Sequence, residues 1–406
     1  MVDLISNLPD EILGKILSLV PTKVAASTSV LSKRWRNLLG LIDSLCFDEP
    51  EEAASGSHRF FDFVDKIFAL LSESPIIKKL SLSLIGRDDD YSRVNRWIWT
   101  ALERGLSELH LHATPRCHGV YLSRELFTSN TLVKLTLSGE YALEVNRVFF
   151  QRSNRFLSYQ IGLMGPTMLS DTEDTTVFLK APSLVFLDYS GYVTNVYDFV
   201  DLDMLVEARL NLMLWDSSVY DEHDDYYDCD NNCYFDDGRP EGISADITGL
   251  VAGISNLTTL HLSPESLELF HLCCESIPVF NNLLTLSIES DKAHGWQAMP
   301  LLLESCPNLH TLVIKVFTFT NILRMVKDEE EICCLSTSHV KVLGISEYGG
   351  SFQELKQMRH FLGKLECLET VKVCVDAEEN NNNREVLRAN LLSLPRLSSK
   401  CNIMFI

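Results

Sequence analysis

The chain has 406 residues, of which 46% are hydrophobic and 22% charged, so it has the composition of a folded globular protein. Its 56 Asp and Glu residues against 35 Lys and Arg residues give a net charge of −21, which the phosphates of nucleic acid would repel. No run of about 18 apolar residues could span a bilayer, and Met1–Leu4 lack the basic stretch of a secretory signal. We therefore expect no nucleic-acid or membrane partner and a location in the cytoplasm and/or nucleus.

The first fifty residues predict three short helices. Leu8-Pro9-Asp10-Glu11 opens the first, because proline is tolerated in a first turn and carboxylates oppose the positive end of the helix dipole. Pro21 ends this helix. The apolar residues of the first and third helices are Ile12, Leu13, Ile16, Leu17 and Val20, then Val30, Leu31, Trp35, Leu38, Leu39 and Ile42. So small a unit cannot bury them all, and the surplus apolar face predicts an interaction surface.

Three stretches of this segment carry a resemblance to a known family. They are Leu8-Pro9-Asp10-Glu11-Ile12-Leu13, Ile16-Leu17-Ser18 and Leu31-Ser32-Lys33-Arg34-Trp35-Arg36. In order, spacing and residue type, residues 3–47 resemble an F-box of the plant type. The resemblance implies docking on the Skp-type adaptor of a Skp–cullin–F-box ubiquitin ligase and, through it, on cullin and RING subunits. The family's contact positions correspond to Leu8, Pro9, Ile12, Leu13, Ile16, Leu17 and Trp35, some of which must instead form the small core of the F-box itself.

The middle of the chain carries an internal repeat of the form L-x-x-L-x-L, with conservative replacements. Its second anchors are Leu80, Leu109, Leu135, Leu187, Ala208, Leu260, Leu286, Leu312, Leu343 and Val371, and a degenerate unit is expected at Ile161-x-Leu163. The commonest step is 26 residues, a spacing typical of leucine-rich repeats. We therefore predict an α/β fold: an N-terminal three-helix F-box followed by an irregular leucine-rich-repeat solenoid, with parallel strands on its concave face.

The residues that alternate with the leucines should point to the concave face. They are small or polar with mixed charges, which suits recognition of a protein or a small polar ligand. The candidate target-binding residues are His110, His112, Asp188, Arg209, His261, Glu289 and Lys315. We interpret the histidines as surface imidazoles rather than metal ligands.

Two further segments interrupt or follow the repeats. Residues 216–237 hold nine carboxylates and no Lys or Arg, which predicts an inserted loop, with an electrostatic hook for a basic partner as the functional alternative. From about residue 339, a β-α-β-α-β run resembles the FBD region of plant F-box/LRR proteins through Ser351-Phe352-x-Glu354-Leu355 and Leu394-Pro395-Arg396-x-Ser398. Such a region would cap the last repeat.

Metal and enzyme motifs are missing from the sequence. The twelve cysteines, with pairs such as Cys273-Cys274 and Cys229…Cys233, lack the paired C-x-x-C pattern of zinc sites, and we expect buried free thiols. The sequence contains no G-x-S-x-G, P-loop or H-E-x-x-H motif. We therefore expect a non-catalytic protein without a metal or cofactor.

Together these features predict three domains: an F-box at 1–50, leucine-rich repeats at 51–338 with the acidic insertion 216–237, and FBD-like repeats at 339–406. The expected function is that of the substrate-recognition subunit of a Skp–cullin–F-box E3 ubiquitin ligase, which binds the adaptor through the F-box and a target protein through the solenoid. The alternative is a scaffold that binds the adaptor without presenting a substrate. Both hypotheses share every sequence feature.

Overall fold

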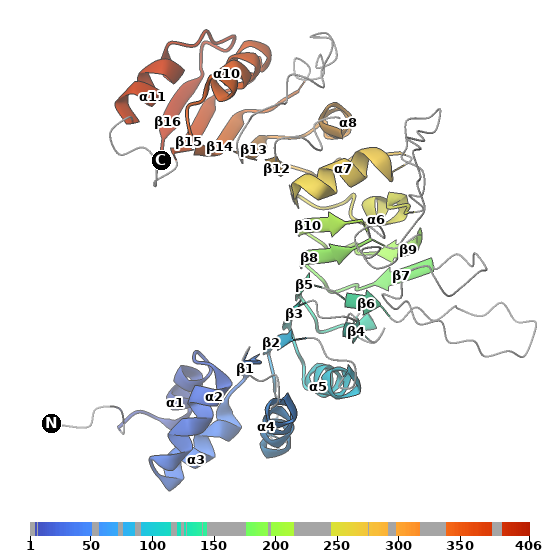
Figure 1. Ribbon diagram of the computed structural model, residues 1–406, viewed down its shortest axis with the longest axis vertical. Coiled ribbons are helices and arrows are strands. Elements are labelled where there is room, and N and C mark those ends of the chain that lie inside the picture. The colour runs from blue at the N-terminus through green and yellow to red at the C-terminus, as the bar shows by residue number, and fades with distance from the viewer. Residues whose placement is uncertain are drawn as a thin grey trace, which may run out of the picture. The chain divides into compact units, whose positions relative to one another are not determined.

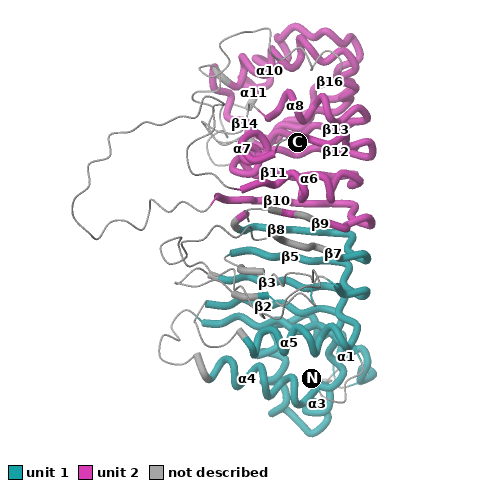
Figure 2. Tube along the Cα trace, turned by 90° about the vertical axis from the view of Figure 1, so that its right-hand side faces the viewer, with its two compact units in different colours: residues 1–191 teal, residues 192–406 magenta. Residues whose placement is uncertain are grey.

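The computed structural model describes two compact units, residues 1–191 and 192–406 (Figure 2). The described residues are 5, 7–50, 57–71, 76–85, 91–114, 120–122, 126, 128–139, 141–143, 176–193, 196–214, 245–274, 276–290, 298–316, 338–375 and 384–406. Within them, no helix combines the length and the apolar character needed to cross a bilayer. The acidic stretch 216–237 and the degenerate repeat at Ile161 and Leu163 lie outside the described residues.

The N-terminal segment forms the three predicted helices (Figure 1): α1 (Asp10–Leu17), α2 (Thr22–Ser27) and α3 (Lys33–Leu38). Pro9 and Pro21 occupy the N-cap positions of α1 and α2, where a missing N–H costs no helical hydrogen bond. A Cβ at Gly14 would lie 2.8 Å from Leu41 Cβ. The absence of a side chain at Gly14 therefore lets α1 approach the turn that follows α3.

Unit 1 continues as a parallel sheet with the strand order β1-β2-β3-β5-β8. These strands are β1 (Ser44–Asp48), β2 (Lys79–Ile85), β3 (Glu108–Thr114), β5 (Lys134–Gly139) and β8 (Phe186–Tyr192). Helices α4 (Ser57–Leu70) and α5 (Tyr91–Glu103) connect the first three of them. The short strands β4 (Val120–Leu122) and β6 (Tyr141–Leu143) pair with each other, and β7 (Thr176–Lys180) precedes β8.

Unit 2 repeats the same arrangement from β10 to β16, with each strand parallel to the next (Figure 1). Its strands are β9 (Val196–Asp201), β10 (Glu207–Met213), β11 (Thr259–Leu262), β12 (Thr285–Ser290), β13 (Thr311–Val316), β14 (Val342–Tyr348), β15 (Thr370–Val375) and β16 (Asn402–Phe405). Its helices are α6 (Thr248–Gly253), α7 (Pro264–Leu272), α8 (Ala298–Glu304), α10 (Phe352–Lys364) and α11 (Arg384–Leu392). The predicted C-terminal β-α-β-α-β run is confirmed.

The core of each unit is a stack of repeat leucines held in register. In unit 1, Leu80 lies opposite Leu109, which lies opposite Leu135, and all three are at most 1% exposed. In unit 2, the same register aligns Leu260, Leu286, Leu312, Leu343, Val371 and Ile403. No single repeat could bury these side chains alone, so neighbouring repeats stabilise one another. The predicted α/β leucine-rich-repeat fold is confirmed.

The first strand of the sheet, β1, was not predicted, and neither were the short strands β4, β6, β7 and β9 that lie between the repeat strands. β1 pairs in parallel with β2, with Leu45 opposite Leu80 and Phe47 opposite Leu82. It follows the repeat pattern as Ile42-x-x-Leu45-x-Phe47, and these three side chains are at most 2% exposed. The sheet therefore begins directly after the three helices, inside the segment assigned to the F-box from its sequence.

Candidate functional site

Helix α1 divides its apolar residues between two faces. Leu13 and Leu17, one turn apart, are 1% and 4% exposed, so they belong to the core of the three helices. Ile12 and Ile16, also one turn apart, are 42% and 43% exposed. Leu13 and Leu17 are therefore members of the predicted set that form the small core, whereas Ile12 and Ile16 stay at the surface.

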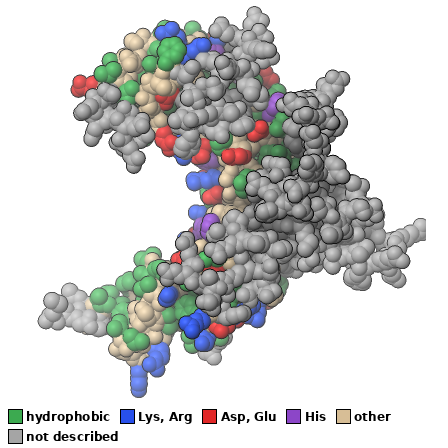
Figure 3. All heavy atoms as spheres, viewed as in Figure 1, with side chains coloured by type: hydrophobic (Ala, Val, Ile, Leu, Met, Phe, Trp, Pro, Cys, Tyr) green, Lys and Arg blue, Asp and Glu red, His purple; other side chains and the backbone are tan. Residues whose placement is uncertain are grey.

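The other predicted contact residues lie at the surface of the same helices. Leu8 and Trp35 are half-buried, and Pro9 is exposed. Further apolar side chains, absent from the predicted set, are more exposed than Ile12 and Ile16: Leu19 at 85%, Val30 at 84%, Leu31 at 66% and Val24 at 50%. Hydrophobic side chains accordingly show at the surface of the N-terminal helices in Figure 3. The signal in the sequence was the excess of large aliphatic residues over what the small core could bury.

We call Leu8, Pro9, Ile12, Ile16, Leu31 and Trp35 the apolar face. They come from α1, from α3 and from the residues that precede each helix. Arg34 ties the two helices together, because its Nε donates a 2.7 Å hydrogen bond to Asp10 Oδ1 and its Nη2 donates one to the Leu8 carbonyl oxygen. An exposed set of large apolar side chains on a small, folded helical unit is suited to burial against another protein.

In unit 1, the outward residues of the strands form a polar surface, the unit 1 strand face: Lys79, Ser81, Ser83, Glu108, His110, His112, Lys134, Thr136, Ser138, Phe186, Asp188 and Ser190. His112 Nδ1 lies 2.9 Å from Ser138 Oγ, and His110 Nε2 lies 3.7 Å from Glu108 Oε2. Burial lowers the pKa of His110, and the ammonium groups of Lys79 and Lys134 lower it further. His110 is therefore neutral at physiological pH.

In unit 2, the predicted residues lie in two ion-pair clusters, which we call the unit 2 strand face: Glu207, Arg209, His261, Glu289, Lys315 and Glu347. Glu207 Oε1 accepts hydrogen bonds of 3.1 and 3.0 Å from Arg209 and lies 3.6 Å from His261 Nε2. Lys315 Nζ lies 3.3 Å from Glu289 Oε1 and 3.7 Å from Glu347 Oε1. Figure 3 shows acidic, basic and histidine side chains interspersed rather than gathered by sign.

Glu347 was missed by sequence reasoning because the strict two-residue alternation fails at the end of β14. The pairing of β14 with β15 shifts register between Ile345 and Tyr348, and Glu347 has φ 59°. This irregularity brings the Glu347 carboxylate to Lys315 while Tyr348 enters the core at 0% exposure. The shift could not be predicted from a pattern that assumes regular strands.

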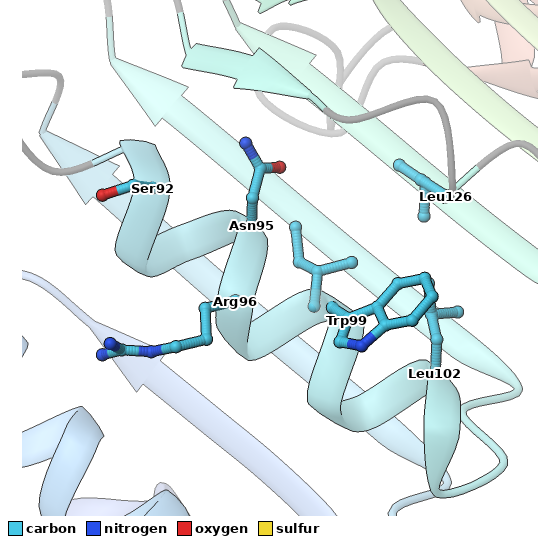
Figure 4. Close-up of a pocket in the computed structure, with 7 residues that line it drawn as sticks. Ser92, Asn95, Arg96, Trp99, Leu102 and Leu126 are labelled. Carbon is cyan, nitrogen blue, oxygen red and sulfur yellow. The ribbon is translucent and has the colours of Figure 1, made fainter.

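A cavity of about 340 Å³ beside α5 was also not predicted. It is lined by Ser92, Asn95, Arg96, Ile98, Trp99, Leu102 and Leu126. Figure 4 shows Leu126 above Trp99, with Asn95 to the left of them on α5. Its walls are mainly apolar, and the indole of Trp99 is 48% exposed.

The cysteines of the described residues are free thiols, and only some of them are buried. Burial raises the pKa of Cys306 to about 12, so this thiol stays protonated and unreactive. Cys367 and Cys374 are exposed, which contradicts the expectation of buried thiols at these two positions.

Comparison with known proteins agrees with this architecture. Residues 5–46 match the F-box domain model. The F-box/LRR-repeat protein At1g48400 of Arabidopsis thaliana is 54% identical, over 100% of this chain and 98% of its own length. The chain belongs to the F-box/LRR-repeat family. Two further Arabidopsis relatives, F-box protein At4g27050 and F-box/LRR-repeat protein At5g35995, are 46% and 40% identical over 100% of this chain and 99% of their own lengths.

Family membership gives names to the two kinds of surface. The three N-terminal helices that carry the apolar face are the F-box, and the strand faces belong to the leucine-rich repeats. The resemblance of residues 339–406 to an FBD region stays a prediction, as do the three domain boundaries.

Proposed function

We propose that this chain is the substrate-recognition subunit of a Skp–cullin–F-box E3 ubiquitin ligase. The observation that carries the proposal is the exposure of Ile12 and Ile16 on α1, inside the residues that match the F-box domain. Their partners one residue on, Leu13 and Leu17, already fill the core, so folding of the F-box leaves the isoleucines in water. Burying them against the Skp-type adaptor would remove this unfavourable exposure.

The proposed adaptor contact is the apolar face. Leu8, Pro9, Ile12, Ile16 and Trp35 come from the predicted set, and Leu31 is added because 66% of its surface is exposed. Aromatic side chains such as the Trp35 indole supply much of the energy at the buried centre of protein interfaces, the apolar residues around them exclude water, and exposed charges at the rim supply little. The adaptor in turn would connect the chain to the cullin and RING subunits, in the cytoplasm and/or nucleus.

The proposed target contact is made by the strand faces. His110, His112 and Asp188 belong to the unit 1 strand face, and Arg209, His261, Glu289 and Lys315 to the unit 2 strand face. Their mixed charges favour a target that is recognised by complementary polar contacts rather than by an apolar surface. Several of these side chains already pair with neighbours, so a target must match or replace ion pairs such as Lys315–Glu289.

The chain's role in this proposal is positional rather than catalytic. It holds a target lysine near the ubiquitin-transfer site of its partners, which raises the local concentration of the lysine to the order of mM, as for other linked sites. We propose no metal or cofactor for this role.

A degradation experiment tests the receptor role. Proximity labelling with the proteasome inhibited would compare the intact chain with a chain that lacks residues 1–41, a deletion that keeps Ile42 and the whole of β1. A target should be labelled by both chains, whereas adaptor and cullin should be labelled only by the intact chain. Removal of the whole chain should then raise the level of the target. If adaptor is labelled but no protein rises in level, the chain is a scaffold, and the receptor role is wrong.

A further inference from the structure

The start of α1 is held by a residue of α3 rather than by its own cap. Pro9 stands at the N-cap position and makes no side-chain hydrogen bond to the helix. Instead, the Arg34 guanidinium donates to the Leu8 carbonyl oxygen and, at 2.7 Å, to Asp10 Oδ1. A single side chain therefore fixes the backbone on one side of Pro9 and the carboxylate on the other.

This clamp joins the two halves of the apolar face. One half, Leu8 and Pro9, lies at the start of α1. The other half, Leu31 and Trp35, lies at the start of α3, with Trp35 directly after Arg34 in the chain. Because Arg34 binds the residues on both sides of Pro9, it sets the spacing between the halves.

The ion pair itself contributes little to folding. The Arg34 and Asp10 side chains are 37% and 51% exposed, and ion pairs this exposed are weak because water screens them. The contribution of Arg34 is instead to the geometry of the two helices. A guanidinium presents a planar fork of donors that can bridge two oxygens, whereas a lysine ammonium is a point charge without that fork.

We propose that Arg34 is a positioning residue for adaptor docking, which holds the Leu8–Pro9 turn at a fixed place beside Trp35. The inference rests on the proposed function, since it assumes that the apolar face is the adaptor contact. A face whose two halves are already correctly spaced loses less conformational freedom on binding, so its affinity is higher.

Arg36 provides a matched control on the same helix. It carries the same charge two residues further on, is exposed, and has no ion pair among the described residues. A change at Arg36 therefore alters a solvated arginine without touching the clamp.

The test measures binding of the full chain to a purified plant Skp-type adaptor by calorimetry, together with the thermal unfolding midpoint. The variants are Arg34→Lys, Asp10→Asn, the double variant and Arg36→Lys. We expect Arg34→Lys to raise the dissociation constant about tenfold and to leave the unfolding midpoint unchanged. Arg36→Lys should change neither quantity. Asp10→Asn should weaken binding, and the double variant should bind no more weakly than Arg34→Lys alone, because both changes break one clamp.

Three results would overturn the proposal while leaving the proposed function intact. Equal binding by Arg34→Lys and the unchanged chain would show that the fork geometry is irrelevant. Losses that add in the double variant would indicate that Arg34 contacts the adaptor directly. A lowered unfolding midpoint for Arg34→Lys would assign Arg34 to folding. Failure of the unchanged chain to bind adaptor would instead overturn the proposed function, and the positioning role with it.

Discussion

Trp97 Nε1 donates a 2.6 Å hydrogen bond to Asp65 Oδ1, and this bond joins α5 to α4. The same carboxylate accepts hydrogen bonds from Arg93 Nη2 at 2.6 Å and from Arg96 Nη2 at 2.8 Å. Trp97 is 1% exposed, so its N–H has no access to water. One aspartate therefore satisfies a buried indole and two arginines on the neighbouring helix.

Replacing this carboxylate should loosen the two helices. Asp65→Ala leaves the Trp97 N–H unsatisfied in the core, and we expect a loss of roughly 2–4 kcal/mol of local stability. Asp62→Ala is the control, because the Asp62 side chain is 61% exposed and its ion pair among the described residues is with Arg93, so a loss below about 1 kcal/mol is expected. Amide hydrogen exchange in α4 and α5 measures the loss of local stability in each variant. Equal protection of these helices in Asp65→Ala and Asp62→Ala would contradict the prediction.

The contribution of Asp65 should also depend on pH. Burial alone would raise the pKa of Asp65, but the hydrogen bonds from Trp97, Arg93 and Arg96 outweigh burial and lower it. A lowered folded-state pKa gives stability that is present above the unfolded-state value of about 3.9 and is lost as pH falls through the folded-state pKa. The difference in protection between the unchanged chain and Asp65→Ala should therefore shrink below about pH 4. A constant difference down to pH 2 would refute the assignment.

Glu347 holds a backbone conformation that favours glycine. Its φ of 59° is unfavourable for a residue with a Cβ, and the ion pair of its carboxylate with Lys315 is partly exposed and therefore weak. We expect Glu347→Gly to leave unit 2 as stable or to stabilise it by up to about 1 kcal/mol. The neighbouring change Ser346→Gly should instead destabilise the strand by roughly 0.5–1 kcal/mol, since Ser346 has no positive φ to relieve. Denaturant unfolding measures the free energy of unfolding of both variants. A Glu347→Gly chain less stable than the unchanged chain would contradict the prediction.

Tyr348 carries a buried hydroxyl without a hydrogen-bond partner among the described residues. Burial raises its pKa, and the nearby Glu354 carboxylate raises it further, so the hydroxyl stays protonated. Tyr348→Phe removes an unsatisfied polar atom and keeps the ring, so unit 2 should become more stable by about 1 kcal/mol. A loss of similar size in thermal unfolding would instead mean that the hydroxyl forms a hydrogen bond in solution.

Much of the fold was readable from the sequence because its signals are repeated. Every anchor from Leu80 to Val371 falls on a strand, since alternating leucines can be buried only by parallel neighbours. β1 was missed because its pattern, Ile42-x-x-Leu45-x-Phe47, ends in phenylalanine and overlaps the helical motif.

The surfaces were less predictable than the core. Leu13 and Ile12 are adjacent, and both fit the apolar stripe of α1, but only the packing of α3 and the Leu41 turn decides which one is buried. Glu347 joins Lys315 only through an irregular strand end, and the clamp from Arg34 to Leu8 and Asp10 bridges 24 to 26 residues of chain. Such long-range relations leave no local pattern.

The most direct test of the adaptor contact compares two exposed aliphatic residues in the full chain. Ile12, 42% exposed on α1, belongs to the apolar face, whereas Val386, 56% exposed on α11, does not. Ile12→Asp should weaken binding to a Skp-type adaptor by about a hundredfold or more, because it places an unpaired charge in a dry contact. Val386→Asp should bind as the unchanged chain does, with both variants folded. Unweakened binding by a folded Ile12→Asp chain would contradict the proposed adaptor contact.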